Sequence, residues 1–107
     1  NTILVSVWSS DVCSSDLGND TDGIDFWGGD NSTIVNNVAL GNGANGINVN
    51  GGDNISVTGN TAGGNTSYGI NLNSSNYVAA TGNTTSTNGG DGLRVHTSFG
   101  AISGNTS

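Results

Sequence analysis

The side chains that could recognise a ligand in this chain recur every 23 residues. They form two columns of four residues each: Asp25, Asn48, Asn71 and Arg94, and Trp27, Asn50, Asn73 and His96. An indole ring can stack on a sugar, and carboxylate and amide groups can hydrogen-bond its hydroxyls. We therefore predict that these eight residues form two exposed columns that contact a polysaccharide. The alternative is that they are ordinary solvated surface residues.

Arg94 and His96 are the only basic residues, and they lie two positions apart. Histidine can accept a proton near neutral pH, and arginine can pair with the carboxylate of a uronic acid. Asp25 and Trp27, however, lie three repeats away, which is about 14 Å if each repeat advances by one strand spacing. That separation is too long for one reacting centre, so we predict no catalytic residues.

Two GGDN stretches place Asp30 and Asp53 one repeat apart. Oxygen-rich turns of this kind can bind calcium. Aspartate and glycine also favour tight turns without any ion, and the nine-residue repeat of calcium-binding β-rolls is missing. We therefore expect no cofactor, with calcium as the alternative. The Asn-Gly pairs at Asn42, Asn45 and Asn88 are interpreted as turn signals.

The elements that must position these residues follow the same 23-residue interval. It is marked by Gly23, Gly46, Gly69 and Gly92. Each glycine precedes two apolar residues separated by one position: Ile24/Phe26, Ile47/Val49, Ile70/Leu72 and Leu93/Val95. Alternation with a period of two places each pair on one face of a strand. A fixed period of this length predicts stacked structural repeats.

Repeats that run in one direction are expected to stack as parallel coils, with strands about 4.8 Å apart. An asparagine column keeps the same step and arrives one residue early in the last repeat: Asn37, Asn60, Asn83 and Asn105. Stacked asparagines can hydrogen-bond amide to amide, which is what a buried amide requires. We predict a structural asparagine ladder at a turn, and a right-handed coil from the usual crossover chirality.

The 23-residue coil, the G-[IL]-x-[FVL] strand and the asparagine column resemble the right-handed parallel β-helix repeats of the pectin-lyase-like family. The resemblance covers residues 22–107. It implies an all-β fold, a right-handed single-stranded parallel β-helix or solenoid of about four coils of 23 residues, and an extracellular or cell-surface location. It leaves the activity open, because this fold carries lyases, hydrolases, epimerases, adhesins and coils without catalysis.

Residues 8–17, WSSDVCSSDL, interrupt the period. Counted back by one repeat, Asp11 falls at the interior position of Ile34. All ten residues also resemble the translation of a common short-read sequencing adapter. We therefore expect residues 1–21 to be an irregular segment with an assembly artefact at 8–17, followed by repeats over 22–107. A divergent capping coil is the alternative. Cys13, the only cysteine, lies in this stretch and supports no thiol or metal chemistry.

The chain contains eight aspartates, no glutamate and one arginine, for a net charge of −7. The absence of a basic patch argues against nucleic acid as a partner, and no apolar stretch is long enough for membrane insertion. Open strand edges in a short stack favour a longer parent protein or end-to-end self-association. We expect a structural or binding solenoid fragment of a larger secreted or cell-surface protein that contacts carbohydrate. The alternatives are a fragment of a polysaccharide lyase or epimerase acting on acidic sugars, and a self-assembling fibre or adhesin subunit.

Overall fold

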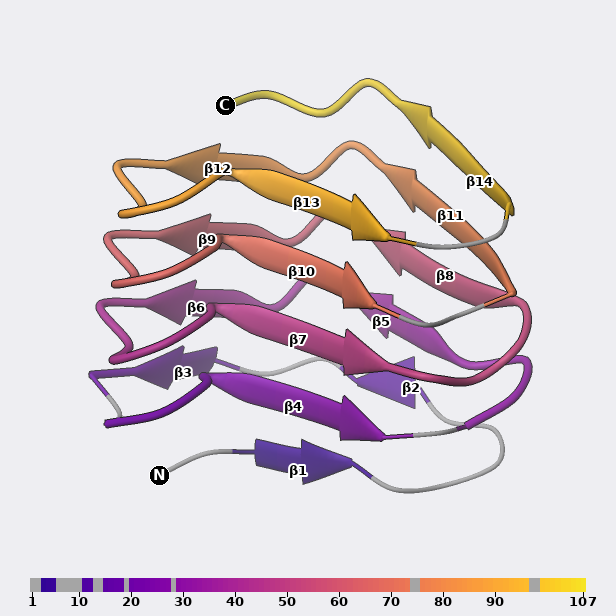
Figure 1. Ribbon diagram of the computed structural model, residues 1–107, viewed down its shortest axis with the longest axis horizontal. Coiled ribbons are helices and arrows are strands. Elements are labelled where there is room, and N and C mark those ends of the chain that lie inside the picture. The colour runs from indigo at the N-terminus through magenta and orange to yellow at the C-terminus, as the bar shows by residue number, and fades with distance from the viewer. Residues whose placement is uncertain are drawn as a thin grey trace.

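The computed structural model describes residues 3–5, 11–12, 15–18, 20–27, 29–73, 76–96 and 99–107, and side chains from residue 18 onward. This part of the chain consists of strands and connecting turns, and all strand pairs are parallel. The coils are right-handed and lie one over another (Figure 1). The predicted all-β, right-handed parallel β-helix is therefore confirmed. No helix that could cross a membrane occurs in the described residues.

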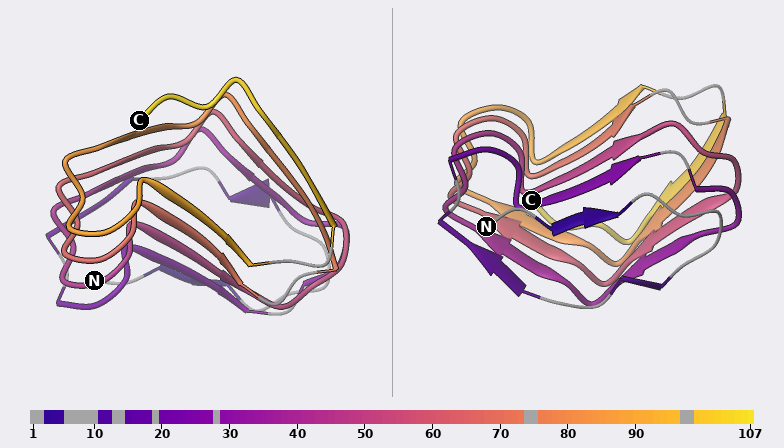
Figure 2. Two further views of the ribbon diagram at one scale, coloured as in Figure 1. Left: turned by 45° about the horizontal axis from the view of Figure 1, so that its top comes forward. Right: turned by 90° about the horizontal axis from the view of Figure 1, so that it is seen from below.

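Each coil contributes one strand to each of three sheets, except the last, which joins the third sheet only through a bridge between Thr106 and Thr84. Sheet A contains β1 (Ile3–Val5), β4 (Ile24–Trp27), β7 (Ile47–Asn50), β10 (Ile70–Asn73) and β13 (Leu93–His96). Sheet B contains β2 (Asp11–Val12), β5 (Thr33–Val35), β8 (Ile55–Thr58), β11 (Tyr77–Thr81) and β14 (Phe99–Ser103). Sheet C contains β3 (Ser15–Leu17), β6 (Val38–Leu40), β9 (Thr61–Gly63) and β12 (Thr84–Ser86). Viewed along the stack, sheets B and C meet at a bend (Figure 2).

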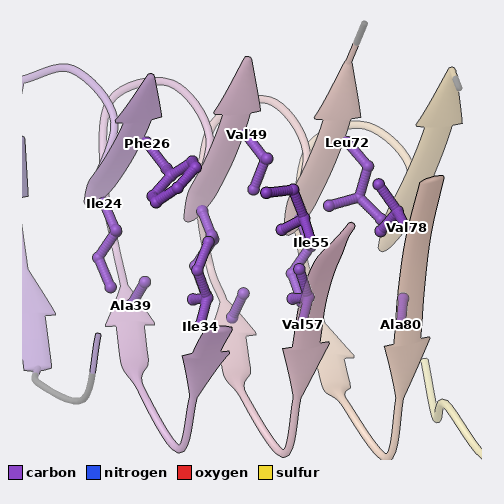
Figure 3. Packing of buried hydrophobic residues seen from close by; sticks show 13 residues of the cluster. Ile24, Phe26, Ile34, Ala39, Val49, Ile55, Val57, Leu72, Val78 and Ala80 are labelled. Atoms are coloured by element: carbon purple, nitrogen blue, oxygen red, sulfur yellow. The ribbon is translucent and has the colours of Figure 1, made fainter. Parts of the chain in front are cut away.

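Equivalent residues of successive coils lie side by side, as the period predicts. Ile47 pairs with Ile24 on one side and with Ile70 on the other, and Val49 pairs with Leu72. All five of these side chains are fully buried, and they belong to a narrow core between the three sheets (Figure 3). Val95, the equivalent of Val49 and Leu72 in the last coil, is 40% exposed. Burial of these apolar columns is the main force that holds the coils together.

The glycine that marks each repeat is required by a close approach of two coils. A Cβ atom on Gly46 would lie 2.6 Å from the carbonyl oxygen of Gly69 and 2.7 Å from Nδ2 of Asn65. Gly23 and Gly69 are enclosed in the same way by the next glycine and by another asparagine. Only a residue without a side chain fits, so the glycine lets each coil turn closely into sheet A.

The predicted asparagine ladder is confirmed. Oδ1 of Asn60 accepts the backbone N–H of Asn37 at 2.9 Å and its Nδ2 at 3.0 Å. The same two bonds join Asn60 to Asn83 and Asn83 to Asn105. Nδ2 of Asn60 also donates to the carbonyl of Ile34 at 2.9 Å. The buried amides of Asn60 and Asn83 therefore have partners for both their donor and their acceptor groups.

A second asparagine ladder stands at the turn into sheet A. Oδ1 of Asn65 accepts the backbone N–H of Asn42 at 3.0 Å and its Nδ2 at 2.9 Å, and Asn88 accepts the same pair of bonds from Asn65. In the sequence, Asn42 and Asn88 indicate only turns, because each precedes a glycine. The signal that could have revealed the ladder is the 23-residue spacing of Asn42, Asn65 and Asn88.

Strands β1, β2 and β3 lie within residues 1–21, the stretch for which we expected irregular structure, and they pair with β4, β5 and β6. Asp11 pairs with Thr33, and Val12 pairs with Ile34. The prediction that Asp11 takes the interior position of Ile34 is therefore wrong by one residue. The shift arises because the connection from β2 to β3 is one residue shorter than that from β5 to β6. Trp8, Cys13 and Ser14 lie outside the described residues.

Candidate functional site

All eight predicted binding residues lie on one face of sheet A. They occupy the second and fourth positions of β4, β7, β10 and β13 and alternate with apolar residues, which are buried in β4, β7 and β10. The parallel register joins them into the two predicted columns: Asp25, Asn48, Asn71 and Arg94, and Trp27, Asn50, Asn73 and His96. We call this face, defined by these eight residues, the sheet A strip.

The first column is a continuous chain of side-chain hydrogen bonds. Nδ2 of Asn48 donates to Oδ1 of Asp25 at 3.0 Å, and Nδ2 of Asn71 donates to Oδ1 of Asn48 at 2.9 Å. An Nη atom of Arg94 donates to Oδ1 of Asn71 at 3.1 Å. A carboxylate can only accept and a guanidinium can only donate, so the charged ends fix the orientation of both amides between them.

Two members of this column are much less exposed than predicted. Asn48 and Asn71 were expected to be outer, solvated residues, yet the side chain of each is only 8% exposed. The turn that enters β10 lies beside the column, because the guanidinium of Arg94 stands 5.2 Å from the centre of the Tyr68 ring. Asn48 and Asn71 therefore form a largely buried polar row in the middle of the strip, between Asp25 and Arg94.

This row retains unused hydrogen-bonding groups. Asn48 and Asn71 each use one amide N–H for the column, and neither has a second protein acceptor among the described residues. In the interior ladder, by contrast, the second N–H of Asn60 donates to the carbonyl of Ile34 and that of Asn83 donates to Val57. The strip therefore presents two amide donors, one strand spacing apart, on its outer face.

The second column carries the aromatic group. Trp27 is 52% exposed, and its indole Nε1 donates to Oδ2 of Asp25 at 2.8 Å. Nδ2 of Asn73 donates to Oδ1 of Asn50 at 3.2 Å, and Nδ1 of His96 lies 3.2 Å from Oδ1 of Asn73. The bond to Asp25 restrains the indole ring and leaves more than half of its surface open to solvent.

The aspartates of the GGDN turns serve the backbone. Oδ1 of Asp30 accepts the backbone N–H of Asp53 at 2.9 Å, and Asp53 in turn accepts a bond from Nδ2 of Asn76. These contacts satisfy turn groups on successive coils. The described residues contain no group of three or more histidine, cysteine, aspartate or glutamate side chains that could hold a metal ion.

Arg94 and His96 contact neutral partners. Arg94 bonds to Asn71 and stands over Tyr68, and His96 lies beside Asn73. Among the described residues neither forms an ion pair with a carboxylate, and Asp25 is separated from Arg94 by two intervening rungs. The geometry therefore brings all eight predicted residues onto one face without assembling an acid, a base and a nucleophile around one point.

Comparison with protein families matches residues 2–106 to the family described as periplasmic copper-binding protein (NosD). Comparisons with curated proteins and with solved structures gave no match. The family match runs from the first coil to the last and includes every strand of sheets A, B and C. Because the match covers nearly the whole chain, the chain belongs to the family described as periplasmic copper-binding protein (NosD).

Proposed function

We propose that this chain is a rigid scaffold of the pectin-lyase-like type that works outside the cytoplasm, at or near the cell surface, and that the sheet A strip binds carbohydrate. The observation that carries the proposal is the pair of unused amide donors on Asn48 and Asn71, in side chains that are only 8% exposed. A buried donor without a partner is unfavourable, and a ligand oxygen would relieve that cost.

The exposed indole of Trp27 supports a sugar as the source of that oxygen. Its ring is restrained by Asp25 and half open to solvent, which suits stacking on the apolar face of a pyranose. Asp25 bonds to the indole directly, and Asn48 and Asn50 are the strand partners of Asp25 and Trp27 on the next coil, where they can bond to the hydroxyls of the sugar. The aromatic and polar contacts that sugar recognition needs are therefore adjacent.

The rigidity of the scaffold adds to affinity. The strip is built on four strands in fixed register, and hydrogen bonds between coils hold its side chains in single orientations. A ligand that binds such a surface loses less free energy to the ordering of side chains than one that binds a loop. Repetition at the strand spacing also favours a polymer over a small molecule.

Copper has no part in the proposed function. Copper is bound in proteins by imidazole, thiolate and thioether groups, and the chain has one histidine, one cysteine and no methionine. His96 lies beside Asn73, and the described residues provide no metal-binding group of three. The residues of this chain therefore do not fit the metal that the family description names.

The test is binding of the intact chain to a panel of soluble oligosaccharides by isothermal titration calorimetry. We expect at least one to bind, and Trp27→Ala to weaken it by about tenfold through loss of ring stacking. Tyr77→Ala is the matched control, because Tyr77 is a comparably exposed aromatic (47%) on sheet B. Absence of binding across the panel, or equal losses in the two variants, would overturn the proposal.

A further inference from the structure

The charged side chains that the structure describes are mostly negative. Among the residues with described side chains, the only cation with a fixed charge is Arg94, and the aspartates are Asp20, Asp22, Asp25, Asp30, Asp53 and Asp91. Asp25 belongs to the strip itself and lies at the end opposite Arg94. A ligand laid along the strip therefore meets a carboxylate at one end and a guanidinium at the other.

The two ends act on different parts of a ligand. Three strand spacings, about 14 Å, separate Asp25 from Arg94, and this distance exceeds the Debye length of about 8 Å at physiological ionic strength. The attraction of Arg94 is therefore screened at the Trp27 end. Asp25, in contrast, is in direct contact with Trp27, since its Oδ2 lies 2.8 Å from the indole Nε1. Any sugar stacked on the indole is a neighbour of this carboxylate.

From this arrangement we infer that the ligand of the strip is a neutral polysaccharide, one that presents hydroxyls and no carboxylates; this rests on the carbohydrate binding proposed above. The carboxylate of Asp25 can only accept hydrogen bonds, whereas the unused amide groups of Asn48 and Asn71 donate. A hydroxyl both donates and accepts, so it satisfies either partner. A uronate carboxylate could serve the amides but would be repelled by Asp25.

The experiment compares oligosaccharides of equal length and linkage with and without carboxylates, such as a mannan and a mannuronan oligomer, or a galactan and a galacturonan oligomer. Affinities of the intact chain are measured by calorimetry at low and high salt. We expect the neutral member of a pair to bind at least about tenfold more tightly, and weak binding of the acidic member to improve with salt because the repulsion is screened.

Asp25→Asn removes the charge and keeps the Oδ1 acceptor for Asn48, but its Nδ2 cannot accept the indole N–H of Trp27. The neutral and the acidic oligomer are therefore compared within this variant, because loss of the indole bond affects the affinity for both. We expect Asp25→Asn to reduce the ratio of the affinity for the neutral oligomer to that for the acidic one. Asp53→Asn removes one negative charge from a turn, and we expect it to leave this ratio unchanged. Circular dichroism verifies that both variants fold. Tighter binding of the acidic oligomer, weakened by salt, would overturn this inference and leave carbohydrate binding intact. Failure of every oligomer to bind would overturn carbohydrate binding itself, and this inference with it.

Discussion

Asn60 donates its side-chain amide to Oδ1 of Asn83, one coil further along the chain, at 3.0 Å. On the outer face the direction is reversed, because Asn71 donates to Asn48, one coil back, at 2.9 Å. The interior direction is set by the backbone, whose carbonyl at Ile34 takes the second N–H of Asn60. The outer direction is set by the charged ends of the column. The two rows of amide dipoles therefore oppose each other across the sheet stack.

We predict that the interior asparagine ladder contributes strongly to the free energy of unfolding. Asn60→Ala removes the acceptor for two groups of Asn37 and the donor to the carbonyl of Ile34, all in a fully buried site. Because buried groups that lose a partner cost about 1–3 kcal/mol each, we expect the free energy of unfolding to fall by about 3 kcal/mol or more. Urea denaturation measures this loss.

The matched control is Asn50→Ala, which removes a partly exposed asparagine whose Oδ1 accepts one bond from Asn73. Solvent can replace that bond, so the expected loss is about 1 kcal/mol or less. Similar losses of unfolding free energy in the two variants would contradict the prediction that the interior ladder contributes more to stability than the outer column that contains Asn50.

We predict that a side chain at the glycine that marks each repeat destabilises the protein by steric overlap. Gly46→Ala would place a Cβ within 2.6 Å of the Gly69 carbonyl oxygen and 2.9 Å of Cβ of Ala62, and neither atom can move without separating two coils. We expect a loss of about 3 kcal/mol, at the upper end for overpacking. Gly41→Ala is the control: its site is open, and only the positive φ of 66° opposes a side chain. Its expected cost is about 1 kcal/mol, and a larger cost at Gly41 than at Gly46 would refute the steric explanation.

We predict that replacing Thr87 by glycine stabilises the protein. It has a φ of 52° and stands where the preceding coils have Gly18, Gly41 and Gly64, all at positive φ. A β-branched residue is strained in this left-handed region, so Thr87→Gly should raise the free energy of unfolding by about 1 kcal/mol. Thr84→Gly, in the neighbouring strand β12, should instead lower it by about 0.5–1 kcal/mol. Thermal denaturation of both variants tests the prediction, which fails if Thr87→Gly melts below the parent.

The fold is predictable from the sequence because the 23-residue repeat determines which residues of successive coils pair. The spacing of Gly46, Ile47 and Asn60 from their copies already fixes the parallel register and the confirmed ladder. The burial of Asn48 and Asn71 does not follow from strand alternation, which makes both of them outer residues. It depends on contacts between coils, such as the hydrogen bonds that join Asp25, Asn48 and Asn71, and the local sequence pattern does not show these contacts.

The first coil leads to a prediction about residues 8–17. In the four later coils, equivalent residues of sheets B and C lie four positions apart in the sequence, as Val57 and Thr61 do. The last of these coils keeps this spacing, although it has a deletion elsewhere. In the first coil, Val12 and Ser15 lie three positions apart, and the residue one repeat before Asn37 in the sequence is Ser14 in place of an asparagine. We therefore expect long-read sequencing of the source gene to lack WSSDVCSSDL and to encode an ordinary repeat there, with an asparagine at the ladder position. If uninterrupted reads contain the ten residues, they are a genuine divergent coil that lacks the ladder asparagine.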